Sequence, residues 1–91
     1  MEMFASVFGH VELTVERWNH ITTFHPEVRT HRKLLQKTLL NPDAVRNSKH
    51  DPSVKICYHA IPKRNKYLAV VVKIDKRNFI LTAYSTGKIK H

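Results

Sequence analysis

The segment from residue 20 to residue 31 contains three of the chain's seven histidines, His20, His25 and His31, and Pro26 interrupts any helix through it. Imidazole titrates near neutral pH, so it can donate or accept a proton under physiological conditions. The 91 residues also carry sixteen Lys and Arg against seven Asp and Glu, a formal net charge of +9. Histidines in a positive field are typical of acid–base chemistry on an anionic substrate, and they are also common zinc ligands.

The spacing of these histidines argues against a metal. His20 and His25 are five residues apart across the proline break, and they do not form the one-turn pair that helical zinc sites use. The single cysteine, Cys57, has no partner of its kind. Two glycines, Gly9 and Gly87, are too few for a loop that cradles phosphates. We therefore expect chemistry without a metal or other cofactor.

The distribution of charge predicts an anionic partner. Basic residues gather in four clusters, at residues 29–33, 63–66, 73–77 and 88–91. Nucleic acid is the commonest polyanion that such clusters bind, although an acidic partner protein would favour the same pattern. One cysteine in an apolar, strand-like run indicates a buried thiol in a reducing compartment. No segment approaches the roughly 18 apolar residues of a membrane span, and no secretory signal is recognisable at the N-terminus, so we expect a cytoplasmic protein without a membrane partner.

Local signals predict the order of elements in a single domain, residues 1–91. A short strand opens the chain and is broken or bulged near Gly9. Thr14 then precedes an amphipathic helix over residues 15–24, which ends where Pro26 restricts the preceding residue. A second helix is expected from Pro26 to Leu40, with basic residues on its exposed surface.

The second half of the chain reads as strands. Short polar turns separate the strands, so we expect them to pair consecutively as a four-stranded antiparallel meander. The predicted fold is therefore α+β, with a short N-terminal strand, two helices and the meander, and with the helices on one face of the sheet. Exposed sheet edges leave the oligomeric state open. The predicted strands cover residues 44–48, 54–61, 67–74 and 79–86.

The alternation of side chains predicts the floor of a site. Each strand should turn one apolar face to the helices and present a second face that mixes hydroxyl, Lys and His side chains. On this second face we expect Thr82 and Tyr84 from the last strand, with Lys55 or His59 from the strand at 54–61. Cleavage of RNA without a metal needs a base for the 2′-hydroxyl, an acid for the departing 5′-oxygen, and donors that stabilise the phosphorane. These residue types supply all three.

Four segments carry a resemblance to a known family: WNHI at 18–21, HPE at 25–27, NPD at 41–43 and TAY at 82–84. Over about 75 residues from Leu13 onward, the chain resembles the phage-associated branch of the barnase–EndoU–colicin–RelE group of small ribonucleases. The resemblance implies a barnase- or RelE-like antiparallel fold, and a metal-independent endoribonuclease of toxin type. Relatives tend to have a basic residue before HPE, where this chain has Phe24.

The sequence thus leads to one principal hypothesis, an endoribonuclease that binds RNA and uses histidine acid–base catalysis. Two alternatives stay open: a non-catalytic RNA-binding module, and a toxin-like partner of an acidic antitoxin or immunity protein. The candidate catalytic residues are His20, His25, Arg46, Thr82 and Tyr84, and the candidate RNA- or phosphate-binding residues are Ser48, Lys55, His59, Lys73 and Lys88.

Overall fold

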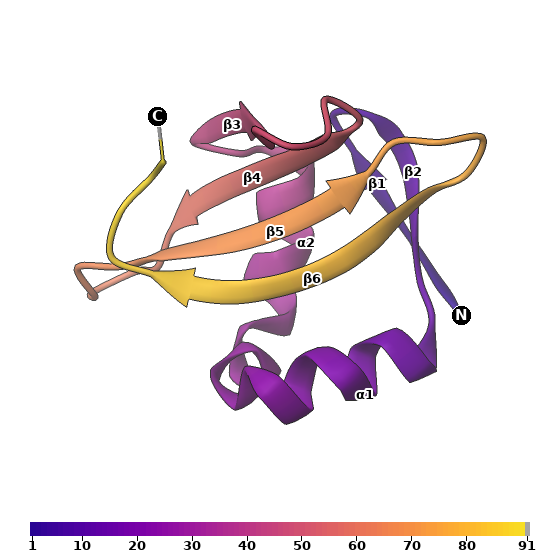
Figure 1. Ribbon diagram of the computed structural model, residues 1–91. Helices are drawn as coiled ribbons and strands as arrows, with labels where there is room; N and C mark the ends of the chain where they lie inside the picture. The colour runs from indigo at the N-terminus through magenta and orange to yellow at the C-terminus, as the bar shows by residue number, and fades with distance from the viewer. Residues whose placement is uncertain (91) are drawn as a thin grey trace.

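The computed structural model describes residues 1–90, and its architecture is α+β (Figure 1). Six strands form one mixed sheet in the order β1-β2-β6-β5-β4-β3, and α2 packs across one of its faces. The elements are β1 (Glu2–Ser6), β2 (Gly9–Leu13), α1 (Val15–Phe24), the 3-10 helix η1 (Pro26–His31), α2 (Arg32–Leu40), β3 (Ala44–Asn47), β4 (Val54–Ala60), β5 (Tyr67–Lys73) and β6 (Asn78–Thr86).

The first helix forms as its local signals predict. The Thr14 side chain accepts a hydrogen bond of 3.0 Å from the backbone N–H of Arg17, which satisfies one of the free donors of the first turn. The helix ends at Phe24, and His25 is its C-terminal cap. The predicted bounds of this helix are confirmed.

The prediction of one continuous helix from Pro26 to Leu40 is wrong. A 3-10 helix occupies residues 26–31. Its last residue, His31, has φ −110° and ψ 28°, which is not an α-helical conformation, so the 3-10 helix and α2 are separate. Both pieces still bury an apolar residue, Val28 in η1 and Leu35 in α2. The break lets η1 lie against β6 while α2 takes a different direction across the sheet (Figure 1).

The last four strands pair consecutively and antiparallel, but the prediction of a four-stranded antiparallel sheet is wrong. The N-terminal segment is a hairpin of two strands, and β2 pairs in parallel with the first residues of β6. The hairpin turns at Gly9, whose φ of +93° lies in a region that favours glycine. Its apolar residues Phe4, Val11 and Leu13 are buried in the core, and this burial stabilises the hairpin against the rest of the sheet.

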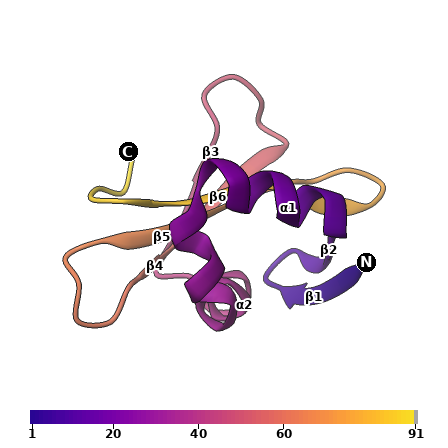
Figure 2. The ribbon, with the colours of Figure 1, turned by 90° about the horizontal axis from the view of Figure 1, so that it is seen from below.

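The core lies between α2 and one face of the sheet. Leu35 and Leu39 of α2 pack with Leu68, Val70 and Val72 of β5, all fully buried. The opposite face, which we name the front face, carries the alternate residues of the same strands. Figure 2, seen from below, shows α2 on one side of the sheet and the β3–β4 loop on the other. Within residues 1–90 no helix is long and apolar enough to cross a membrane.

Candidate functional site

The candidate site lies where the outer edge of β6 has no neighbouring strand. β2 pairs only with Asn78 and Phe79, so the rest of β6 faces α1 and η1. Arg17 of α1 donates to the backbone carbonyl of Leu81 over 3.4 Å, and Glu27 of η1 accepts from both the backbone N–H and the hydroxyl of Ser85, each at 3.2 Å. These two side chains hydrogen-bond to the backbone edge that a further strand would otherwise cover.

His25 stands at the junction of these elements. Its backbone N–H donates to the carbonyl of Ile21 over 2.7 Å, which fixes the end of α1. Its ring lies 5.8 Å from the Tyr84 ring between centroids, and its Nδ1 lies 3.9 Å from Oε2 of Glu27. The side chain remains 39% exposed, so the imidazole is held by neighbours on two sides and still reaches solvent.

The two predicted catalytic histidines, His20 and His25, share a cavity with the hydroxyl of Thr82. This cavity, which we name the histidine hollow, has a volume of about 310 Å³. The His20 ring packs against the ring of Phe24, 4.8 Å away and one helical turn later. Tyr84 contacts His25 at the same place, so four of the five predicted catalytic residues come together here. The hollow is lined by His20, Ile21, Phe24, His25 and Thr82.

The environment of the site sets the charge of two of its groups. Partial burial opposes ionisation of Glu27, but hydrogen bonds from its own backbone N–H and from Ser85, and the nearby His25, outweigh it and lower the pKa of this carboxyl. Burial raises the pKa of the Tyr84 phenol, and the neighbouring Tyr58 phenol raises it further. At neutral pH a carboxylate therefore faces His25 Nδ1, and the Tyr84 hydroxyl keeps its proton.

Arg46 and Ser48 lie elsewhere on the front face. They line a separate cavity of about 250 Å³, which we name the basic hollow, and its lining is Arg46, Asn47, Ser48, Lys49, His50, Ile56 and Lys90. Strand pairing puts Arg46 opposite Ile56, Ile56 opposite Val71, and Val71 opposite Thr82. Arg46 and Thr82 thus belong to one row, separated by three strand spacings, or roughly 14 Å.

Lys55 and His59 are on the helix-covered side, so the prediction that they share a face with Thr82 and Tyr84 is wrong. Lys55 lies opposite Val72 and His59 opposite Leu68, both core residues. Their polar ends reach partners near the sheet margin: Lys55 Nζ donates to Oδ1 of Asn47 over 2.7 Å. His59 Nδ1 lies 2.8 Å from its neighbour's carbonyl oxygen and 3.7 Å from Oδ2 of Asp43. The register of β4, which places Cys57 opposite Val70, decides this orientation.

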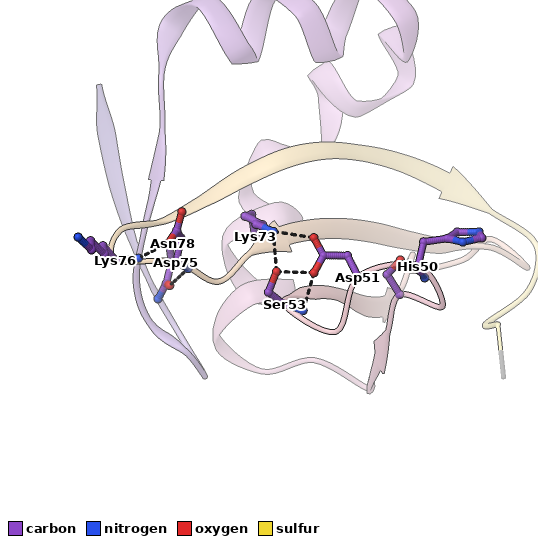
Figure 3. Close-up of polar contacts among 8 residues, drawn as sticks. His50, Asp51, Ser53, Lys73, Asp75, Lys76 and Asn78 are labelled. Atoms are coloured by element: carbon purple, nitrogen blue, oxygen red, sulfur yellow. Dashed lines mark hydrogen bonds and ion pairs between the residues drawn. The ribbon is translucent and has the colours of Figure 1, made fainter.

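Lys73 is on the front face, but its ammonium group forms an ion pair with Asp51. Its Nζ donates to Asp51 Oδ2 and to Ser53 Oγ, each over 2.6 Å, and Figure 3 shows this contact between β5 and the β3–β4 loop. The Lys73 ammonium lowers the pKa of the Asp51 carboxyl far below its usual range, with Ser53 adding to the effect. Lys88 is exposed after β6, where its backbone N–H donates to Thr86 Oγ1 over 3.4 Å.

The structure adds three residues to the site. Arg17 and Glu27 flank the histidines. Tyr58 is fully buried, and its hydroxyl has no well-formed hydrogen bond among residues 1–90. The Tyr58 phenol lies close enough to Tyr84 to raise the pKa of the Tyr84 phenol. Arg17 precedes His20 by one helical turn, and this spacing was a visible signal of a shared face. Nothing in the sequence indicated that Tyr58 and Tyr84 meet, because they come together over Ala69, which lies opposite both.

Within the described residues, no group of three or more His, Cys, Asp or Glu side chains is arranged to hold a metal ion. No protein-family model matches the sequence, no curated protein is significantly similar to it, and no solved structure is a significant match to its fold.

Proposed function

We propose that the protein is a metal-independent endoribonuclease whose scission site is the histidine hollow. One observation carries the proposal: His25 has a carboxylate beside its Nδ1 and a protonated phenol beside its ring, at a cavity that also contains His20 and Thr82. This combination offers proton acceptors, proton donors and neutral hydrogen-bond donors in one place. The net charge of +9 favours the approach of a polyanion.

The chemistry follows from the two nitrogens of His25. Glu27 lies beside Nδ1 and stabilises the imidazolium, so Nε2 is the atom that takes the proton from a 2′-hydroxyl. The 2′-oxygen then forms a bond to phosphorus and the bond from phosphorus to the 5′-oxygen breaks. The leaving 5′-oxygen receives a proton from a second acid, for which His20 is the candidate in the same hollow. The products are a 2′,3′-cyclic phosphate and a 5′-hydroxyl.

Charge that develops on the phosphorane oxygens needs fixed donors. Tyr84 is suited to donate a hydrogen bond because its raised pKa keeps the phenol protonated. Thr82 supplies a second hydroxyl at the wall of the hollow. Arg17 of α1 lines a neighbouring cavity together with His20, and its guanidinium is the candidate cation for the phosphate. Lys55 has no part in this proposal because it lies on the other face of the sheet.

The family resemblance extends the proposal to a toxin-type ribonuclease. Such an enzyme would require an acidic antitoxin or immunity protein that covers the basic surface in the producing cell. A non-catalytic RNA-binding module remains the competing proposal, supported by the charge alone. The two differ in whether the histidines are needed for product formation.

The decisive experiment incubates the purified protein with a defined RNA in the presence of EDTA. We expect cleavage to a 2′,3′-cyclic phosphate, and a loss of about 100-fold or more for His25→Asn. His10→Asn is the matched control, because His10 is an exposed histidine on the N-terminal hairpin. Absence of cleavage, cleavage that needs added metal, or equal activity of both variants would contradict the proposal. RNA binding that survives His25→Asn without any product from the wild type would support the non-catalytic module.

A further inference from the structure

We propose that the basic hollow is a second phosphate-binding subsite, which binds the backbone of single-stranded RNA three strand spacings across the sheet from the scission point. The inference rests on the proposed function for its biological substrate, but its binding chemistry can be tested without cleavage. It assigns a ligand class, the phosphodiester of a single-stranded polynucleotide, to residues that the proposed mechanism does not use.

The lining of the basic hollow is positively charged. Arg46, Lys49, His50 and Lys90 surround the cavity of about 250 Å³, and no Asp or Glu of the described residues lines it. None of these four side chains forms an ion pair within residues 1–90. Among residues 1–90, the Arg46 guanidinium donates a single hydrogen bond, to the carbonyl of the adjacent Val45 over 3.0 Å. Several donors therefore converge on one hollow without an anion to satisfy them.

The β3–β4 loop, which carries Lys49 and His50, is fixed in place by hydrogen bonds. Asp51 Oδ1 accepts from the backbone N–H of Ser53 at 3.0 Å and from its hydroxyl at 2.6 Å, which closes a turn around Pro52. Lys73 then anchors this turn to β5 through Asp51 and Ser53 (Figure 3). The one carboxylate in the loop is thus bound to Lys73 rather than to the cations of the hollow. We name this contact the Lys73 clamp, and its effect is to hold Lys49 and His50 beside Arg46.

The basic hollow and the histidine hollow are connected by one row of residues across the sheet. Arg46 and Thr82 stand at opposite ends of one row across the front face, with Ile56 and Val71 between them. Their separation of roughly 14 Å is too long for a single nucleotide unit and fits an extended strand with several phosphates. An extended strand that crosses this row can have its backbone bound at both ends. Efficient substrates should therefore be longer than a dinucleotide.

The test uses a single-stranded DNA oligomer of about eight nucleotides as the probe, since it lacks the 2′-hydroxyl and cannot be cleaved. We expect the double variant Arg46→Gln with Lys90→Gln to bind it at least about tenfold more weakly. The matched control is Arg64→Gln with Lys66→Gln in the exposed β4–β5 turn, which removes the same two residue types and the same net charge. Equal loss in the two double variants would overturn the subsite, because a general electrostatic effect would then explain the binding.

A second variant separates positioning of the loop from overall charge. Asp51→Asn removes a carboxylate, so general electrostatics predicts tighter binding of a polyanion. The Lys73 clamp predicts weaker binding, by about threefold or more, because the loop that carries Lys49 and His50 is released. Thermal unfolding of the variant establishes that the fold is retained. Tighter binding by a folded Asp51→Asn protein would overturn the role of the clamp.

Three further results decide between the proposed function, the subsite and a protein-binding site. In the first, the wild type does not cleave RNA, and the Arg46→Gln, Lys90→Gln double variant binds DNA more weakly while the Arg64→Gln, Lys66→Gln control does not. The subsite then stands as a nucleic-acid site and the proposed function fails. If RNA is cleaved and dinucleotides are cut as fast as octamers, the subsite fails and the proposed function stands. If the Arg46 and Lys90 pair weakens binding of polyglutamate but not of DNA, the hollow is a protein-binding site and the inference is overturned.

Discussion

The ring of His25, at the end of α1, lies 5.8 Å from the ring of Tyr84, on the last strand, and Glu27 lies 3.9 Å from the same imidazole. The contact exists because α1 and η1 lie along the part of β6 that has no strand beside it. It places an imidazole beside a phenol whose raised pKa keeps its proton in place at neutral pH. Four predictions follow from this arrangement and from the core behind it.

Tyr84→Phe should lower the turnover of a defined RNA by about 100-fold, because it removes one hydrogen-bond donor to the developing negative charge. Tyr67→Phe is the matched control: Tyr67 lies on the same face of the sheet but lines neither hollow. Single-turnover cleavage in EDTA measures both. Similar rates for the wild type and Tyr84→Phe would exclude the phenol from the mechanism.

Glu27→Gln should destabilise the protein at neutral pH, by about 0.5 kcal/mol or less because the side chain is 40% exposed. The pKa of Glu27 is lower in the folded state than its ordinary 4.5, so the stabilisation is present above that value. It is lost as the pH falls through the folded-state pKa. Urea denaturation at several pH values should therefore show wild type and variant converging in acid, and a gap that widens there would contradict the assignment.

Tyr58→Phe should leave stability unchanged or raise it slightly, by up to about 1 kcal/mol. The hydroxyl of Tyr58 is buried beside the Tyr84 phenol without a well-formed hydrogen bond among residues 1–90, so its removal relieves a desolvation cost. The same change should lower the pKa of Tyr84, since Tyr58 contributes to raising it. Spectroscopic titration of the tyrosines, with thermal unfolding alongside, measures both effects. A large loss of stability would mean that the hydroxyl has a partner in solution.

Cys57 should be inert in the native protein. Burial raises the pKa of its thiol to about 11, and the residue is fully buried on the helix side of β4. A thiol-reactive disulfide should therefore label it only as fast as the protein unfolds, and denaturant should accelerate the reaction. Rapid labelling under native conditions would show that β4 opens locally.

Several elements could be predicted because their signals are local. Thr14 caps α1 within one turn, and Pro26 ends that helix by restricting its neighbour. Short polar turns between the last four strands favoured pairing of each strand with the next. The structure has this pairing, β3 with β4, β4 with β5 and β5 with β6. The parallel pairing of β2 with β6 joins distant parts of the chain, and no local residue pattern specifies it.

The face that each residue of β4 presents was harder to predict. Val54, Ile56 and Tyr58 are the more apolar set, and alternation alone favours turning them to the helices. The structure turns them to the front, since Cys57 pairs with Val70 in the core and the ends of Lys55 and His59 find polar partners at the sheet margin. A strand with apolar residues on both faces does not determine its own orientation.

By itself, the sequence determined the α+β class, the cap and end of the first helix, and the excess of positive charge. Each of these depends on composition or on neighbours within one or two turns of chain. Only the tertiary structure decided that His25 meets Glu27 and Tyr84, that Arg46 lines a different hollow, and that Lys73 is bound to Asp51. Those contacts depend on strand order and register, which are set by the burial of the whole core at once.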